Sequence, residues 1–478
     1  MIDSVIKNGA VVTPSGVFKG GVAVDGGVIV AVGPDASLPT EAKKVIDAKG
    51  NFILPGVVEV HTHVGLRPAH IPFDQSWQDQ WESESEEAVH GGITTIRSNL
   101  AVLGPYLPVI DQYIEWAEGR SYLDFSIYPT VISDEHIDEL LPMAEKGMPS
   151  WKCFFDPYQA EEGDQIGLRH TDAGKLYKAF EKFKEFGYPA VVMLHAEEYA
   201  LYHMLEKRLI DAGRTDLKAW SDSRPNICEA MKIHAAAMIC EEVGQGGGVP
   251  LYIVHMSTKE GVDICKTYQD RGVPVIAETL PCFLTHTKHM GDEVGVWGKI
   301  NPPFREVEDM KRMWEGLRSG VVTCMGTDHC AYSQVDKENG NGKYGDVWKA
   351  LPGLSGGMQH WLPVMMTDGY HGAKLSIEQI VKIMCENNAK TFGLYPKKGV
   401  LQVGSDADVI IVDPEKRTTI DESFYKGLNK TYSIYWGKEL RGMPVMTMSR
   451  GDVLMEDGKT VGKPGRGKYV PCRDYTRG

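Results

Sequence analysis

The sequence predicts an α/β fold: a (β/α)8 TIM-like barrel with a small β-sandwich domain formed from both chain ends. Three observations favour it. Short apolar runs alternate with helical patterns through the middle of the chain, and histidine, lysine and aspartate side chains fall in or just after several of these runs. Glycine-punctuated, β-branched segments occupy both ends. Regular strand–helix alternation is typical of a closed parallel barrel.

The first part of the sandwich comes from residues 1–55, where β-like runs alternate with turn signals. The same pattern returns in residues 400–478, in GVLQVGSDADVIIVD and GMPVMTMSRGDVLMEDGK. Neither segment is large enough to bury a core alone. We therefore expect the two to fold together around a barrel of residues 56–399. The sequence GKPGRGKY at 462–469 is expected to be a flexible tail.

The central region supplies the barrel strands. Helical segments such as residues 109–119, 174–187 and 308–320 separate them. The acidic run ESESEE at 82–87 is expected to be the solvated face of another helix. No GxGxxG turn follows a strand, which argues against a dinucleotide site. The strand-like runs are residues 57–60, 93–97, 124–131, 150–155, 189–194, 250–254, 274–278 and 321–325.

Composition narrows the class of partner. The 478 residues carry a formal net charge of −14, which argues against nucleic acid or an anionic membrane, because both attract basic surfaces. A small-molecule substrate is the better expectation. No secretory signal opens the sequence and no apolar stretch approaches the ~20 residues of a spanning helix, so we expect a cytoplasmic protein. Nine cysteines without a CxxC pair are expected to be reduced.

A histidine pair ends the first barrel strand. His61 and His63 follow the apolar run FILPGVVEV, and side chains two apart on a strand share a face. The simpler alternative is a pair of polar residues at a strand-to-loop junction. The long apolar approach favours a buried, chelating pair.

Lys152 lies inside the apolar and aromatic run SWKCFF. A lysine at a strand end can extend its ammonium to water. Burying the charged form is costly, however, and a buried lysine can lose its proton. The neutral amine can take up carbon dioxide as a carbamate, whose two oxygens can bridge two cations. The other candidates are four histidines and one aspartate, so two metals would need such an oxygen ligand.

His195 and His255 each follow an apolar strand, and Asp328 ends the eighth strand in GTDHC. A core histidine bound to a carbonyl is the usual alternative for the first two, and a helix N-cap for the third. The carboxyl ends of barrel strands share one rim. We therefore expect these residues to be metal ligands, with Asp328 also acting as general base.

The segments PGVVEVHTH, GGITTI, HAEE, ETLPCFL, KINPPFRE, GTDHC and KKGVLQVGSDADVIIVD together resemble the amidohydrolase superfamily. Within it, the chain is similar to the cyclic amidohydrolases, namely hydantoinases and dihydropyrimidinases, with allantoinase and dihydroorotase as relatives. The resemblance implies a homotetramer and two zinc ions, bridged by the lysine carbamate and a hydroxide. It implies the following ligands: His61, His63, Lys152 and Asp328 for one ion, and Lys152, His195 and His255 for the other.

The implied activity is hydrolysis of a cyclic amide C–N bond, as in hydantoin or dihydropyrimidine ring opening. The resemblance places Tyr158, Asn301 and Pro352 at the substrate. All three depart from the family pattern: Tyr158 is displaced by about one position, Asn301 replaces a serine and Pro352 an asparagine. An allantoinase- or dihydroorotase-like activity, and hydrolysis of another cyclic imide or a linear amide, stay open. A non-catalytic dihydropyrimidinase-like scaffold is disfavoured, because such proteins lose ligands that this chain keeps.

Overall fold

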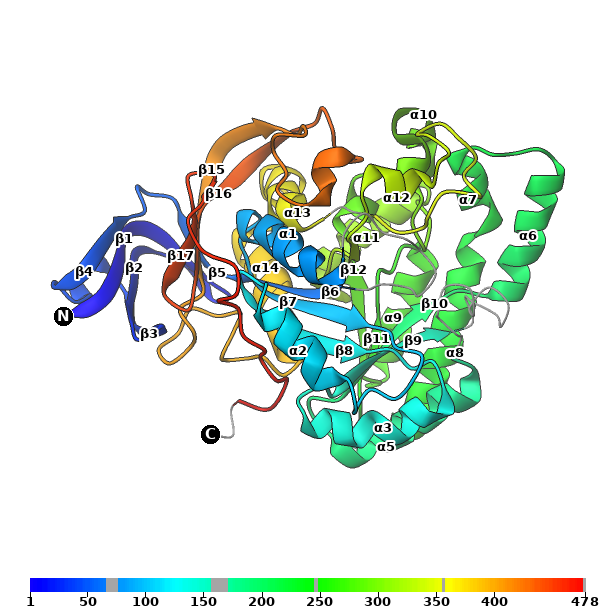
Figure 1. The fold of residues 1–478 in the computed structure, drawn as a ribbon, viewed down its shortest axis with the longest axis horizontal. Helices are drawn as coiled ribbons and strands as arrows, with labels where there is room; N and C mark the ends of the chain where they lie inside the picture. The colour runs from blue at the N-terminus through cyan, green and yellow to red at the C-terminus, as the bar shows by residue number, and fades with distance from the viewer. Residues whose placement is uncertain (66–75, 156–170, 245–247, 355–356, 476–478) are drawn as a thin grey trace.

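The barrel occupies the centre of the molecule (Figure 1). The computed structural model describes residues 1–65, 76–155, 171–244, 248–354 and 357–475. Each predicted barrel run forms a parallel strand, as the alternating pattern indicates. The strands are β6 (Val57–His63), β7 (Ile93–Leu100), β8 (Asp124–Pro129), β9 (Ser150–Phe155), β10 (Val191–Ala196), β11 (Leu251–Ile253), β12 (Val275–Thr279) and β13 (Val322–Met325).

Two junctions close the ring. One run of paired strands is β13-β12-β11-β10-β9, and the other is β14-β6-β7-β8, where β14 (His329–Cys330) continues the chain after β13. At the first junction, Thr130 beyond β8 pairs in parallel with Lys152 of β9. At the second, β14 pairs with β6, and the Asn388 side chain donates to Val58 O of β6 and Met325 O of β13.

Helices cover the outside of the barrel, and the segments predicted at 109–119, 174–187 and 308–320 are confirmed as α2, α5 and α11. None of the described helices is both long and apolar enough to cross a membrane. The main helices are α1 (Trp77–His90), α2 (Ile110–Glu118), α3 (Asp134–Glu145), α5 (Ala173–Phe186), α6 (Tyr199–Asp211), α7 (Leu217–Ser223), α8 (Asn226–Gly244), α9 (Lys259–Asp270) and α11 (Val307–Ser319). Shorter ones are α10 (Gly291–Val294), α12 (Gln334–Glu338), α13 (Met358–Val364), α14 (Ile377–Val381) and α15 (Asn387–Thr391).

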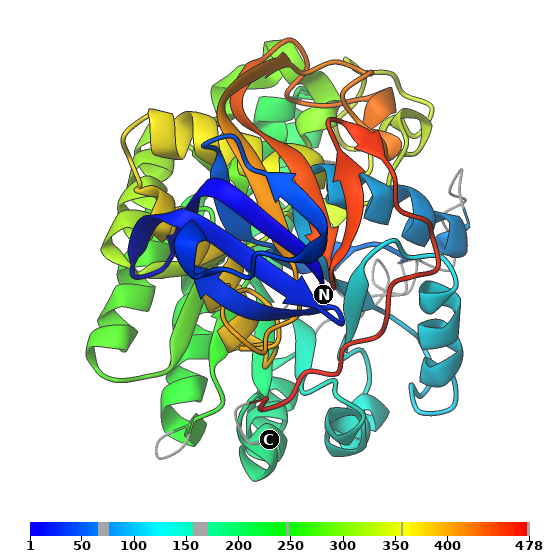
Figure 2. The ribbon, with the colours of Figure 1, turned by 90° about the vertical axis from the view of Figure 1, so that its left-hand side faces the viewer.

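Both chain ends contribute to one further sheet, ordered β18-β17-β16-β15-β5-β1-β2-β3, with β4 paired to β1. Strands from the two ends lie side by side in Figure 2 and meet where β15 pairs antiparallel with β5. Buried residues from both ends, including Val11 and Met448, form its core. The strands are β1 (Ile2–Thr13), β2 (Gly16–Asp25), β3 (Val28–Gly33), β4 (Ala42–Asp47), β5 (Phe52–Pro55), β15 (Val409–Thr419), β16 (Glu439–Ser449), β17 (Asp452–Glu456) and β18 (Lys459–Thr460).

The acidic run in α1 is not a solvated face. Glu84 and Glu87 are fully buried. A Glu84 carboxylate oxygen accepts a hydrogen bond from His329 Nε2 (2.7 Å), and Glu87 accepts one from the Asn429 amide (2.7 Å). The prediction was wrong because α1 lies between the barrel and the segment around Asn429, so this helix face points inward.

The C-terminal segment is also ordered, contrary to the prediction of a flexible tail. Phe125 N in β8 donates to Lys468 O, and Val470 N donates back to Phe125 O. The tail thereby pairs with the start of β8, whereas the contact with β9 lies beyond the other end of this strand. It satisfies backbone groups that would otherwise be left without partners. All nine cysteines are free and buried, which agrees with the expectation of reduced thiols.

Candidate metal centre

The predicted ligands gather at one rim of the barrel. His61 and His63 end β6, Lys152 lies on β9 and His195 lies near the end of β10. His255 and Asp328 follow β11 and β13. Because parallel strands end at a common rim, residues hundreds of positions apart in sequence become neighbours. All of these residues are buried except His63, whose side chain is 11% exposed.

One group of donor atoms forms around Asp328. Its Oδ1 lies 3.0 Å from His63 Nε2 and 3.3 Å from His61 Nε2. Lys152 Nζ lies 3.0 Å from the same His61 nitrogen. The ligand atoms of the two histidines and Asp328 all lie within 4.8 Å of one another. This spacing allows one cation to contact all three.

A second group lies beside the first. His195 Nδ1 and His255 Nε2 approach to 2.9 Å. The rings of His61 and His255 have centroids 5.4 Å apart, so the two groups are contiguous. Lys152 contacts the first group through His61. It lies on β9, which pairs with β10, the strand that carries His195 of the second group. The donor atoms around Asp328 thus continue along the rim to His195 and His255.

Two glutamates orient the imidazoles. Glu278 at the end of β12 accepts hydrogen bonds from His61 Nδ1 and from His255 N, each at 2.8 Å. Glu197 accepts from His195 Nε2 at 2.8 Å. A carboxylate on one ring nitrogen fixes the tautomer and leaves the lone pair on the other, as carboxylate–histidine–metal groups require. His61 Nε2 and His195 Nδ1 are therefore the nitrogens free to bind an ion.

The electrostatics suit a cation site. Burial lowers the pKa of His61 and His255 well below the usual value, so both are neutral ligands. Burial alone would raise the pKa of Asp328, but His61 and His63 hold it at about 2. Burial also lowers the pKa of Lys152 to about 8, against the raising effect of Asp328 and Glu278. Neutral imidazoles, a carboxylate and a readily deprotonated amine fit divalent metal ions.

Backbone strain marks two of these positions. His255 has φ 40° and Asp328 has φ 50°. Residues other than glycine rarely adopt the left-handed region, and such strain persists where surrounding structure holds it. Asp328 is held by its own N–H, which donates to His61 O at 2.9 Å. The strained turn at Asp328 thus follows from bringing the segment after β13 back to β6 at the rim.

The predicted substrate residues lie in three segments. Tyr158 is outside the described residues. Asn301 follows the short turn at Gly295–Gly298, and its Oδ1 is buried without a partner in the described part of the chain. Pro352 belongs to the segment 351–354, whose Leu354 O accepts a hydrogen bond from Cys330 N (2.8 Å), two residues beyond Asp328.

Sequence reasoning missed the orienting carboxylates. Glu278 and Glu197 are both buried, and each stands in or beside an apolar strand in PVIAE or VVMLHAEE. A buried carboxylate needs a partner, which is the signal that identifies such residues. Glu59 is a third example: one oxygen accepts from His61 N at 2.7 Å, and burial raises its pKa to about 8.

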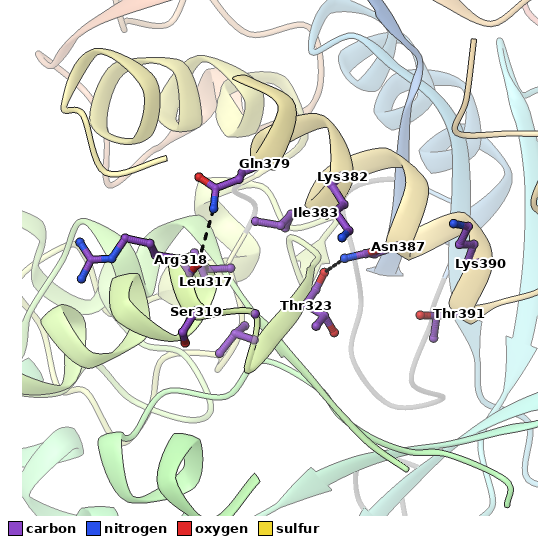
Figure 3. Close-up of a pocket in the computed structure, with 12 residues that line it drawn as sticks. Leu317, Arg318, Ser319, Thr323, Gln379, Lys382, Ile383, Asn387, Lys390 and Thr391 are labelled. Carbon is purple, nitrogen blue, oxygen red and sulfur yellow. Dashed lines mark hydrogen bonds between the residues drawn. The ribbon is translucent and has the colours of Figure 1, made fainter. Parts of the chain in front are cut away.

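A separate cavity of about 510 Å³ lies at the opposite end of the barrel. It is lined by residues near the start of β13, including Thr323, and by residues of α14 and α15 (Figure 3). Asn387 donates to Thr323 O there at 2.8 Å. None of the predicted ligands lines this cavity, so it is distinct from the candidate metal centre.

Comparison with known proteins agrees with this geometry. Residues 224–454 match the model of the amidohydrolase family. The chain is 33% identical to an L-hydantoinase of Paenarthrobacter aurescens, over 99% of both chains, and 30% identical to a D-hydantoinase of Streptomyces coelicolor, over 98% of this chain and 97% of that one.

Solved structures agree as well. An L-hydantoinase (dihydropyrimidinase) from Arthrobacter aurescens superposes with TM-score 0.89 at 32% identity, covering 98% of this chain and 100% of that one. A dihydropyrimidinase from Brevibacillus agri gives 0.86 at 27%, covering 99% of each. Full-length similarity confirms both the expected fold and the expected family. The chain therefore belongs to the amidohydrolase family, in the group that includes the hydantoinases and dihydropyrimidinases.

Proposed function

We propose that this protein is a metal-dependent hydrolase that opens the ring of a hydantoin or dihydropyrimidine by cleaving a cyclic amide C–N bond. The observation that carries the proposal is the pair of contiguous donor groups, around Asp328 and around the contact between His195 and His255. The full-length relatives named as L- and D-hydantoinases support the substrate class.

The proposed centre holds two divalent ions, with zinc favoured by the nitrogen-rich donor set. The carbamate proposed for Lys152 would contribute to both ions, and the position of Lys152 Nζ 3.0 Å from His61 Nε2 supports this role. The proposed ligands of the first ion are His61, His63, Lys152 and Asp328, and those of the second are Lys152, His195 and His255.

The bound ions would supply an activated water and polarise the amide carbonyl. Asp328 is the proposed general base and acid: it takes a proton during attack and returns it to the leaving ring nitrogen. His63 Nε2, 3.0 Å from Oδ1, positions this carboxylate, and the pKa of Asp328 of about 2 keeps it ionised. The buried rim limits competing water around the reacting amide.

Three further assignments belong to the proposal. Tyr158, Asn301 and Pro352 are proposed to contact the substrate, and the unpartnered Asn301 Oδ1 supports a polar contact. Residues 56–399 form the proposed barrel domain, and 1–55 with 400–478 the sandwich domain and tail. A homotetramer is proposed by analogy with the family.

A ring-opening assay on metal-analysed protein tests the proposal. Dihydrouracil, substituted hydantoins of both hands, allantoin and dihydroorotate would be compared by loss of absorbance. We expect about two metals per chain and turnover of a hydantoin or dihydrouracil. Asp328→Asn should keep much of the metal and lose turnover. Turnover confined to allantoin or dihydroorotate, or absent with both metals bound, would overturn the proposed substrate class.

A further inference from the structure

Lys337 of α12 is fully buried, and within the described residues its amino group donates to three backbone oxygens. Nζ donates to Lys299 O at 2.5 Å and to Leu351 O at 2.8 Å, and it also donates to Gly353 O. In the described part of the chain it forms no ion pair. Three carbonyl acceptors use all three N–H bonds of a protonated lysine.

These carbonyls come from two segments that are far apart in the sequence. Lys299 precedes Asn301 by two residues, while Leu351 and Gly353 flank Pro352. One ammonium thus joins the backbone beside both described residues that we assign to the substrate. Leu351 N also donates to Lys337 O (3.1 Å), so α12 contacts this segment in both directions.

Both segments are attached to the metal centre. Leu354 O accepts from Cys330 N (2.8 Å), and Leu354 pairs with His329, the neighbour of Asp328. Ile300 and Leu354 share one buried cluster with Leu280, which directly follows β12. A change in the distance between the two segments would therefore alter the pocket wall without removing a metal ligand.

Burying this lysine without a carboxylate is costly for stability. Burial and the nearby Lys299 lower the pKa of Lys337. An apolar side chain would fill the same space, but it would leave three carbonyl oxygens without their donor. The gain from a lysine is therefore geometric: its amino group, together with Lys299 Nζ, which donates to Ala350 O at 2.6 Å, sets how far apart the two backbone segments lie.

We propose that Lys337 is a positioning residue for substrate binding, which holds the Asn301 and Pro352 segments together as one wall of the pocket. This inference rests on the proposed function, since it takes the two segments as the substrate wall. Lys337 itself touches neither the metal ligands nor the reacting atoms. Its loss should therefore weaken substrate binding more than it slows the chemical step.

The test replaces Lys337 with Met, with Lys349→Met as the matched control. Lys349 belongs to the same region, but its side chain is 69% exposed, and among the described residues its ammonium pairs with Asp346 alone, at 3.8 Å. Metal content, KM and kcat for ring opening would be measured on each variant. Amide hydrogen exchange of the peptides around 296–301 and 349–354 gives a readout that does not depend on activity.

For Lys337→Met we expect KM to rise about tenfold, kcat to stay within threefold and metal content to be unchanged, with faster exchange in both peptides. Lys337→Gln, which keeps up to two N–H donors, should give an intermediate KM. Unchanged exchange in Lys337→Met, or a fall in kcat at constant KM, would overturn the proposal. If Lys337→Met does not fold, a wild-type KM in Lys337→Gln would overturn it.

The two proposals fail in different ways. A wild-type protein that opens no ring refutes the proposed function, and the exchange measurement then still decides whether Lys337 holds the two segments together. If the wild-type protein opens rings and the Lys337 variants have the same KM as Lys349→Met, the positioning role alone is refuted.

Discussion

Burial raises the pKa of Glu278 to about 7, so above that pH replacing it with Gln removes one negative charge from beneath the proposed metal centre. Glu278 Oε1 accepts from His61 Nδ1 and His255 N, and Oε2 accepts from Tyr252 OH, each at 2.8 Å. The amide oxygen of glutamine can still accept the first two hydrogen bonds. The substitution therefore tests the charge that fixes the histidine tautomer rather than the packing.

The magnitude follows from the hydrogen bond to His61. A bond to a charged group contributes about 1.5–3 kcal/mol and a neutral one about 0.5–1.5 kcal/mol, so the loss is about 1–1.5 kcal/mol. At about 1.4 kcal/mol per factor of ten, metal affinity should fall about tenfold. That is the low end of the roughly 10–100-fold effects seen for such outer carboxylates. Competition with a chromogenic chelator measures the affinity directly.

Glu139→Gln is the matched control. Glu139 is also buried and accepts two backbone hydrogen bonds, from Tyr106 N (2.7 Å) and Leu107 N (2.9 Å), but it lies away from the metal ligands. The metal affinity of the Glu139→Gln variant should equal that of the wild type. Metal affinity of Glu278→Gln within twofold of the control would refute the reasoning that this carboxylate orients His61.

Three other predictions follow. Lys152→Ala should abolish metal loading and turnover, and elemental analysis that still finds both ions would contradict the carbamate bridge. Lys398→Met should lower the free energy of unfolding by about 3–5 kcal/mol, because the buried Lys398 ammonium binds three buried aspartates at 2.6–3.0 Å. The control is Lys397→Met, because Lys397 is the partly exposed neighbour of Lys398. Urea unfolding should show a far smaller loss of unfolding free energy for Lys397→Met than for Lys398→Met, and equal losses would count against this explanation. Burial and Lys438 lower the pKa of His286 to about 3 from 6.5, so the unfolded state takes up this proton first as the pH falls. Through this group, the free energy of unfolding should drop on the order of 2 kcal/mol from pH 6.5 to 5. Urea unfolding at the two pH values should show a smaller drop for His286→Phe than for the wild type. An equal drop in both proteins would exclude a contribution from His286.

The barrel and the residues of the candidate metal centre were predictable because both depend on local patterns. Each barrel strand is a short apolar run, and His61, Lys152, His195, His255 and Asp328 are polar exceptions in or just after such runs. Once the strands are parallel, their carboxyl ends must share a rim. Contact between residues as distant as His61 and Asp328 then follows without knowledge of any loop.

The errors have a common cause. The face of α1 that carries Glu84 and Glu87 looks solvated in sequence, and becomes interior only because residues near Asn429 pack over it. The C-terminal segment looks flexible, and becomes ordered only because β8 leaves backbone groups unpaired near Phe125. Neither partner can be identified from the segment itself.

The sequence by itself therefore determined the fold class, the family resemblance and the residues that form the candidate metal centre, because strand periodicity and strand-end polarity are local properties. Only the tertiary structure decided which carboxylates orient the histidines and that Lys337 joins the Asn301 and Pro352 segments. Those roles depend on partners from distant parts of the chain. A buried charge acquires its role from the groups that surround it, and the fold alone brings those groups together.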